Sequence, residues 1–151
     1  MENKLHIIRE LNDELFKLIS DDPVRPHIPH ENRVGENREI FVYFDKIPKA
    51  VCCVSYRSTV PVSEEDLFTP CENATTAVFY TIWSYTRGAG KELVKLMSNY
   101  LTGQGIERMV TLSPKTDMAY KFHIGNGALV LQENENTVNY EYRKREELLN
   151  I

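Results

Sequence analysis

The sequence has little of what marks nucleic-acid-binding or membrane-spanning proteins. Its formal net charge is −4, and its short basic run, Arg143-Lys144-Arg145, is followed at once by Glu146-Glu147. Binding to a phosphate backbone needs clustered lysine and arginine, so nucleic acid is not expected as a partner. No apolar stretch approaches the roughly 18 residues of a membrane-spanning helix, so no membrane association is expected.

Cysteine is also scarce, and its spacing does not match the common zinc motifs. The three cysteines are the adjacent pair Cys52-Cys53 and the isolated Cys71. No Cys-x-x-Cys pair is present, so no metal site is expected. Unpaired, scattered thiols are typical of a reducing compartment. The N-terminal stretch, MENKLHIIRELNDELF, is charged and periodic rather than typical of a signal peptide. These features together predict a cytoplasmic protein.

What is present is the pattern of one soluble globular domain over residues 1–151. A near-continuous apolar run at 76–85 predicts a central strand buried on both faces. The helix and strand that follow it predict one right-handed crossover. The order of elements predicts an α/β (α+β) fold, in which helices pack on a mixed sheet. The expected helices are 3–20, 90–103 and 115–124, with a short one near 63–66, and the other expected strands are 38–45, 49–60, 107–113, 128–134 and 137–144.

A glycine-rich stretch lies where the strand 76–85 hands over to the next helix, in the segment TIWSYTRGAGKELV (81–94). Glycine lets another group approach the backbone closely, and a helix N-terminus offers free N–H donors, so the pattern predicts a bound phosphate. A Walker A loop does not fit, because Tyr85 replaces its first glycine and Glu92 its Ser/Thr. A dinucleotide fingerprint lacks its third glycine. A plain strand–turn–helix junction with two glycines is the alternative.

The segment from Tyr85 to Gly90 resembles the acyl-CoA loop of the GNAT acetyltransferases, whose motif is [Q/R]-x-x-G-x-[G/A]. The match holds from Arg87 onward, whereas Tyr85 departs from the usual Gln/Arg. The element order also resembles that fold, except that an initial strand is missing or very short. The resemblance implies a GNAT-like acyl-CoA N-acyltransferase fold with a mixed, mostly antiparallel sheet flanked by helices. It also implies acetyl-CoA or another acyl-CoA as cosubstrate, bound by Ile82, Trp83, Arg87, Gly88, Ala89, Gly90 and Lys91.

A second segment, TDMAYKFHIGNGA (116–128), resembles the last helix motif of the same family. His123 stands where many members carry the tyrosine that protonates the departing CoA thiolate. The segments FYTIW, TLSP and FHIGNGA resemble a narrower branch, which holds malonyl-CoA decarboxylase and GNAT-like decarboxylase domains. In that branch a hydroxyl on the central strand and a histidine hold the thioester carbonyl and handle the proton. That implies Thr81, with Ser84 as the fallback, and His123 as catalytic residues here.

Each of these residues also has a plainer interpretation. His123 can simply cap the end of its helix, and Thr81 can be an ordinary β-branched strand residue. The chain also has SPKTDMA where the malonyl-CoA decarboxylases continue SPIPGF. The leading expectation is therefore transfer of an acetyl group from acetyl-CoA to a small amine acceptor. Malonyl-CoA-type decarboxylation is the alternative, and a non-catalytic CoA-binding module is the second alternative.

The proline-rich loop 20–37 is the remaining informative stretch. In GNAT-like folds this segment commonly forms one wall of the acceptor site, which implies Arg25 and His27 as substrate-binding residues. Arg25 could pair with a carboxylate of the substrate, or with Asp21 or Asp22 in a rigid surface loop. His27 and His30 lack the further ligands that a zinc site needs. GNAT-like domains often dimerise through their last strands, so a homodimer is left open.

Overall fold

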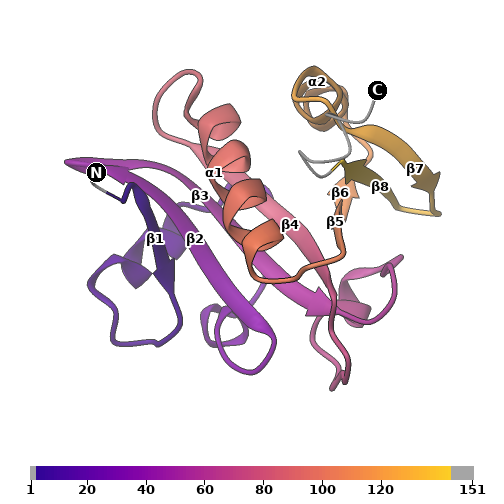
Figure 1. Ribbon diagram of the computed structural model, residues 1–151, viewed down its shortest axis with the longest axis horizontal. Helices are drawn as coiled ribbons and strands as arrows, with labels where there is room; N and C mark the ends of the chain where they lie inside the picture. The colour runs from indigo at the N-terminus through magenta and orange to yellow at the C-terminus, as the bar shows by residue number, and fades with distance from the viewer. Residues whose placement is uncertain (1–2, 144–151) are drawn as a thin grey trace.

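A mixed eight-stranded sheet runs through the centre of the molecule (Figure 1). The computed structural model describes residues 3–143. The strands lie in the order β1-β2-β3-β4-β5-β8-β6, and β7 pairs with β8. Only β4 and β5 are parallel; the other pairs are antiparallel, as predicted. The strands are β1 (Leu5–Ile8), β2 (Arg38–Asp45), β3 (Ile47–Arg57), β4 (Thr76–Ser84), β5 (Arg108–Thr111), β6 (Ser113–Pro114), β7 (Leu129–Glu133) and β8 (Thr137–Tyr142).

The N-terminal segment differs from the prediction. The expected helix 3–20 is wrong, because β1 pairs with β2 and the 3-10 helix η1 (Glu14–Asp21) follows. The β-branched residues Ile7 and Ile8 suit a strand, and the edge of β2 supplies the partner that a local pattern cannot show. Asp13 then starts η1 by accepting a hydrogen bond from the Leu15 amide at 2.9 Å. The initial strand, which the sequence predicted to be missing or very short, is present with four residues.

The other predicted elements are confirmed within a few residues. The longest helix is α1 (Ala89–Gly103), and α2 (Asp117–Gly125) is capped by Thr116, which accepts from the Ala119 amide. The predicted strand 107–113 is divided into β5 and β6, and Lys144, at the end of the last predicted strand, lies outside the described residues. The short 3-10 helices are η2 (His30–Arg33) and η3 (Glu64–Leu67).

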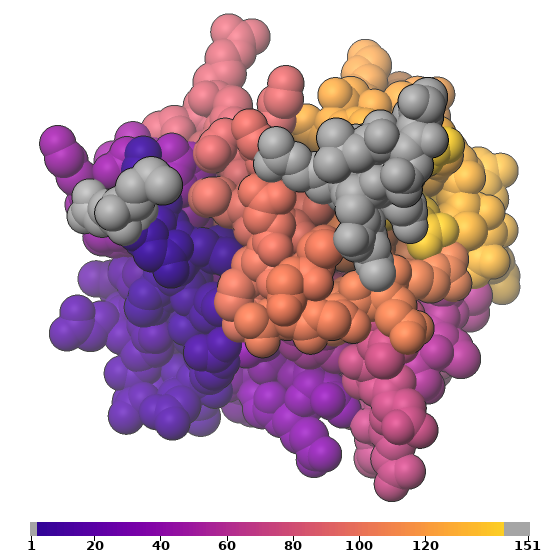
Figure 2. Space-filling view, in the orientation of Figure 1, coloured from indigo at the N-terminus to yellow at the C-terminus, as the bar shows by residue number. Residues whose placement is uncertain are grey.

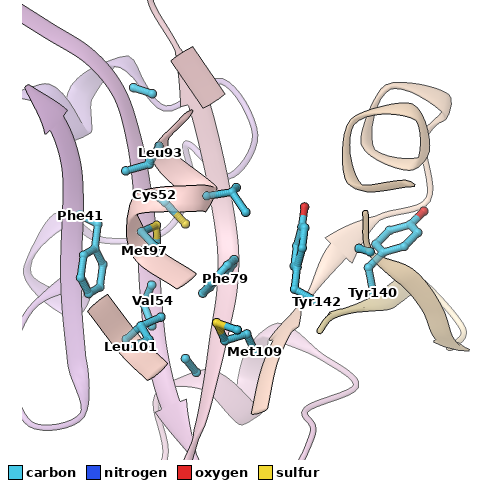
Figure 3. Packing of buried hydrophobic residues seen from close by; sticks show 14 of the residues in the cluster. Phe41, Cys52, Val54, Phe79, Leu93, Met97, Leu101, Met109, Tyr140 and Tyr142 are labelled. Atoms are coloured by element: carbon cyan, nitrogen blue, oxygen red, sulfur yellow. The ribbon is translucent and has the colours of Figure 1, made fainter. Parts of the chain in front are cut away.

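Both faces of the central strands are covered, which explains their apolar runs. On one face α1 directs Leu93, Met97 and Leu101 toward the sheet (Figure 3). On the other face, residues of η1, of the loop after it and of η3 complete a second apolar cluster with the sheet. The buried members from these covering segments include Leu18, Ile19, Ile28, Val34 and Leu67.

The proline-rich loop is anchored to the sheet by a buried ion pair. Arg33 and Asp22 are both without side-chain exposure, and Arg33 Nη1 lies 2.6 Å from Asp22 Oδ2. Arg33 Nη2 also donates to the carbonyl oxygens of Arg25 and Ile28. Asp22 in turn accepts a hydrogen bond from Thr81 of β4 at 2.8 Å. The loop therefore packs in a defined conformation against the central strand.

An Arg33→Met variant is expected to lower the free energy of unfolding by about 3–5 kcal/mol, because the Asp22 carboxylate stays buried without its charged partner. The measurement is denaturant-induced unfolding. Arg9→Met is the matched control, since Arg9 pairs with Glu39 at the surface with 58% of its side chain exposed. Its expected change is within about 1 kcal/mol. Equal losses in the two variants would show that the buried pair has no special weight.

Candidate active site

The sheet opens where β4 and β5 part. The two strands pair from Thr76 to Phe79 of β4, and the ladder ends where the Leu112 amide donates to the Phe79 carbonyl at 3.0 Å. Beyond that bond, Ser113 pairs with β8 instead. Next to this point Tyr80 is an extra residue in β4, because the register with β3 shifts around it. Such a bulge bends a strand and redirects its side chains, so the carboxyl half of β4 leaves its neighbour.

A cavity of about 350 Å³ lies in this split. One wall comes from the carboxyl half of β4, the other from the start of β6 and from α2, and the proline-rich loop contributes Pro23 and Val24. None of the described residues that line the cavity carries a carboxylate or a permanent positive charge. The lining residues with polar side-chain atoms include Thr81, Trp83, Ser84, Ser113, Thr116 and His123. Phe122 lies in the wall next to His123.

The two glycines at the start of α1 are required for different reasons. Gly88 has a φ of +82°, in the left-handed region, where the backbone of a residue with a side chain is strained. A Cβ at this position would meet nothing within 4 Å. The space before the first turn of α1 is therefore open, and the N–H groups of that turn have no acceptor within the helix. Figure 2 shows the segment around residues 85–90, in salmon, projecting from the surface. By contrast, a Cβ at Gly90 would lie 2.9 Å from the Phe122 ring, so this glycine lets α2 pack on α1.

His123 of α2 is a buried, neutral side chain on the cavity wall. It is 4% exposed, its ring stacks on Tyr140 with centroids 5.1 Å apart, and Nδ1 lies 2.6 Å from the Tyr142 hydroxyl. Burial lowers the pKa of His123 to about 4. Burial also raises the pKa of Tyr142, so its hydroxyl stays protonated. In the tautomer in which this hydroxyl donates to Nδ1, the imidazole proton lies on Nε2; in the other tautomer Nδ1–H donates to the hydroxyl.

Thr81 lies beside the cavity, but its hydroxyl proton is already used. Its Oγ1 donates to Asp22 Oδ1 at 2.8 Å, and the residue is 3% exposed. Burial would raise the pKa of Asp22, but hydrogen bonds from the Arg25 amide, from Arg33 and from Thr81 outweigh it and lower that pKa. The carboxylate is therefore a firm acceptor. Thr81 can offer the cavity a lone pair but no proton, whereas the exposed Ser84 lies further along β4.

Ser113 is a site residue that sequence reasoning missed. It lines the cavity, is 3% exposed, and its hydroxyl lies 2.8 Å from that of Thr111. Thr111 is fully buried and its Oγ1 already accepts from the Tyr140 amide. The Ser113 hydroxyl donates to Thr111 Oγ1. Because hydroxyl hydrogens rotate, Ser113 can turn that proton toward a ligand in the cavity if Thr111 then donates to Ser113. The only local signal was a polar residue just after a buried strand, in the segment TLSP.

Solved structures share this architecture. Malonyl-CoA decarboxylase from Agrobacterium vitis matches 93% of the chain with a TM-score of 0.75 at 20% identity, and 60% of its own length is covered. An acetyltransferase from Bacillus subtilis, solved with CoA, matches 93% with a TM-score of 0.64 at 13% identity, over 98% of its length. The GNAT domain of PAT from Streptomyces lividans matches 91% with a TM-score of 0.64 at 11% identity, over 88% of its length.

This chain has the GNAT fold. No protein-family model and no curated protein matches the sequence. The chain spans about 60% of the Agrobacterium vitis decarboxylase. Within residues 3–143, no three or more His, Cys, Asp or Glu side chains are grouped to hold a metal ion. In the same range, no helix has the length and apolar character to cross a membrane.

In this GNAT fold the predicted substrate-binding residues do not line the cavity. Arg25 is 7% exposed, and its three guanidinium nitrogens contact protein acceptors: Glu64 and the carbonyl oxygens of Tyr80 and Leu112. His27 lies outside it, with 61% of its side chain exposed and Nε2 2.8 Å from Glu64. The structure thus brings His123, Thr81 and Gly90 to one cavity, and Arg25 and His27 are not in its lining. The other predicted loop residues are also outside the lining: Arg87, Gly88 and Lys91 are exposed and Ala89 is buried. Contact of Arg25 and His27 with a substrate stays a prediction.

The neutral His123 predicts a loss of stability at acid pH. Unfolded histidine has a pKa of about 6.5, whereas burial lowers the pKa of His123 to about 4. Between these values the unfolded chain binds a proton that the folded protein excludes, so stability is full above the unfolded pKa and is lost as the pH falls toward 4. From pH 7 to 4, wild type is expected to lose on the order of 3 kcal/mol more free energy of unfolding than His123→Gln. Denaturant titrations at both pH values check this, and parallel curves would contradict it.

Proposed function

We propose that this chain acts on a coenzyme A thioester and that its reaction is the decarboxylation of a malonyl-type thioester. The observation that carries the proposal is the composition of the cavity wall. A neutral His123 and the Ser113 hydroxyl line it, groups that can supply an N–H and an O–H donor to a ligand, and no described lining residue carries a carboxylate. Hydrogen-bond donors without a strong base suit a reaction in which negative charge develops on a carbonyl oxygen.

The thioester would bind with its diphosphate at the N-terminus of α1. The open space before Gly88 fits this group, because a Cβ there would meet nothing within 4 Å and the first-turn N–H groups face no helical acceptor. The pantetheine arm would then enter the split along β4, past Ile82 and Trp83, which line the cavity. That path would bring the thioester into the cavity that His123 and Ser113 line.

The reaction needs donors more than it needs a base. The bond between the carboxylate carbon and C2 breaks, carbon dioxide leaves, and the electron pair forms an enolate whose charge lies on the thioester oxygen. Nε2–H of His123 and the hydroxyl of Ser113 would donate hydrogen bonds to that oxygen. One proton, delivered from water or through His123, then adds to C2 and gives the acetyl thioester. A mostly apolar wall also favours loss of the charged carboxylate, which is poorly solvated there.

Acetyl transfer to a small amine is the second candidate. It is supported by the match to the Bacillus subtilis acetyltransferase, which was solved with CoA. An amine that arrives as an ammonium ion must lose a proton before it attacks the thioester. His123, whose pKa burial lowers to about 4, is a weak base for that step. Transfer would therefore depend on water or on an acceptor that arrives unprotonated.

The test uses purified protein and no acceptor. Malonyl-CoA and acetyl-CoA are incubated separately with the protein, and the CoA species are followed by mass spectrometry. Conversion of malonyl-CoA to acetyl-CoA above the enzyme-free rate is expected. Binding of both thioesters without conversion would overturn decarboxylation and direct the search to amine acceptors. A lack of reaction with those acceptors too would leave a CoA-binding module.

A further inference from the structure

The buried side chain of Arg25 joins the two sides of the split. Nε donates to the carbonyl oxygen of Tyr80 at 2.7 Å, and Nη2 donates to that of Leu112 at 2.8 Å. Tyr80 is the bulge residue of β4, and Leu112 connects β5 to β6. Because both nitrogens belong to one planar guanidinium, the spacing of the two carbonyl groups follows from its rigid geometry.

These two carbonyls lie just beyond the last hydrogen bond between the parallel strands. That bond runs from the Leu112 amide to the Phe79 carbonyl, and Ser113 then turns to β8. A buried carbonyl without a donor costs roughly 1–3 kcal/mol, so a split sheet needs donors at this place. Arg25 supplies both from outside the sheet.

Arg25 is itself held firmly. Nη1 pairs with Glu64 of η3, and the backbone amide of Arg25 donates to Asp22 at 3.0 Å. Asp22 is bound in turn by the buried Arg33. The guanidinium therefore cannot follow either strand if the two move together or apart, and it acts as a spacer of constant width.

We propose that Arg25 is a positioning residue that sets the width of the split and so holds open the slot for the pantetheine arm of a CoA thioester. The residues next to its two acceptors line the cavity: Thr81 follows Tyr80, and Ser113 follows Leu112. Arg25 is not among the lining residues, so it acts through the strands rather than by touching the ligand. This role rests on the proposed function, which assigns the cavity to that arm.

The test compares two probes that differ only in the arm: CoA, and 3′-phospho-ADP, which has the nucleotide and diphosphate without pantetheine. In Arg25→Lys, a single ammonium keeps the charge beside Glu64 but cannot serve as the flat fork that spans both carbonyls. The dissociation constant of CoA is expected to rise at least about tenfold, whereas that of 3′-phospho-ADP stays within about twofold, both by calorimetry. Glu64→Gln is the control, since it removes the outer ion pair and leaves the fork, and both constants should stay within about twofold.

The outcomes separate the role of Arg25 from general damage. An unchanged CoA affinity in Arg25→Lys, or an equal loss for both probes, would overturn the positioning role. Arg25→Gln repeats the test if the lysine variant does not fold, and a failure of both to fold would make Arg25 a residue of stability only. Wild-type protein that binds neither probe would overturn the proposed function, and with it this role. Wild-type binding of CoA with normal binding by Arg25→Lys would overturn this role alone.

Discussion

A His123→Gln variant is expected to turn over malonyl-CoA about 100- to 1,000-fold more slowly than wild type, because a positioned proton-handling group contributes a rate factor of this size. Glutamine can still accept a hydrogen bond from Tyr142, but it cannot carry a proton to C2 at neutral pH. The affinity for CoA should stay within about threefold, because the proposed diphosphate site is at the other helix, α1. Turnover is measured by mass spectrometry of the CoA species, and affinity by calorimetry.

His6→Gln is the control for this variant. His6 belongs to the same residue type, but it lies on the edge strand β1 with 42% of its side chain exposed, outside the cavity lining. Its turnover should equal that of wild type. A His123→Gln variant with wild-type turnover would make His123 a packing residue between α2 and β8. A parallel loss of CoA affinity would show damage to the cavity rather than to the chemistry.

A Gly88→Asp variant is expected to weaken CoA binding at least about 100-fold, or roughly 2.7 kcal/mol. The new carboxylate would occupy the open space before α1 and would compete for the N–H groups of its first turn, and its charge would repel the diphosphate. The residue would also be strained at its φ of +82°. Calorimetric titration with CoA gives the affinity, and thermal unfolding gives the stability of the same preparation.

Gly105→Asp provides a matched control for backbone strain. Gly105 has a φ of +81°, and a Cβ there would also meet nothing within 4 Å. It follows the C-terminal end of α1, about 22 Å along the helix from Gly88 by the rise of 1.5 Å per residue. Both variants carry the same backbone strain, but a carboxylate is favoured at a helix N-terminus and disfavoured at its C-terminus, so Gly105→Asp should lose at least as much stability. Only Gly88→Asp should lose CoA binding. Normal CoA affinity in Gly88→Asp would remove the loop from the site.

Local pattern was sufficient for the elements that carry their own signal. The run 76–85 is apolar on both faces because β4 is covered on both, so its burial could be predicted without its partners. The start of α1 follows from Gly88, whose left-handed φ ends the preceding loop. The spacing of apolar residues in 3–20 predicted a helix, which was wrong: Leu5–Ile8 pair with β2, more than 30 residues along the chain, and form a strand.

The candidate site could be predicted only in part. Sequence resemblance placed His123 and the glycine loop, and the structure brings His123 and Thr81 to one cavity. The sequence resemblance did not show that the Thr81 proton is bound by Asp22, or that the second glycine, Gly90, makes room for Phe122. Ser113 was missed for the same reason. Whether a hydroxyl can donate depends on which neighbours fold against it, and those neighbours are distant in sequence.

The sequence by itself determined the order of the elements from β2 onward, the central buried strand and the glycine-bearing helix start, because these depend on residues within a few positions of one another. Only the tertiary structure decided where the sheet splits and what holds it open. Arg25 meets Tyr80 and Leu112 across 55 and 87 positions of the chain. No local periodicity records such a contact, since it arises when the loop, the bulge of β4 and the turn into β6 pack together around one buried guanidinium.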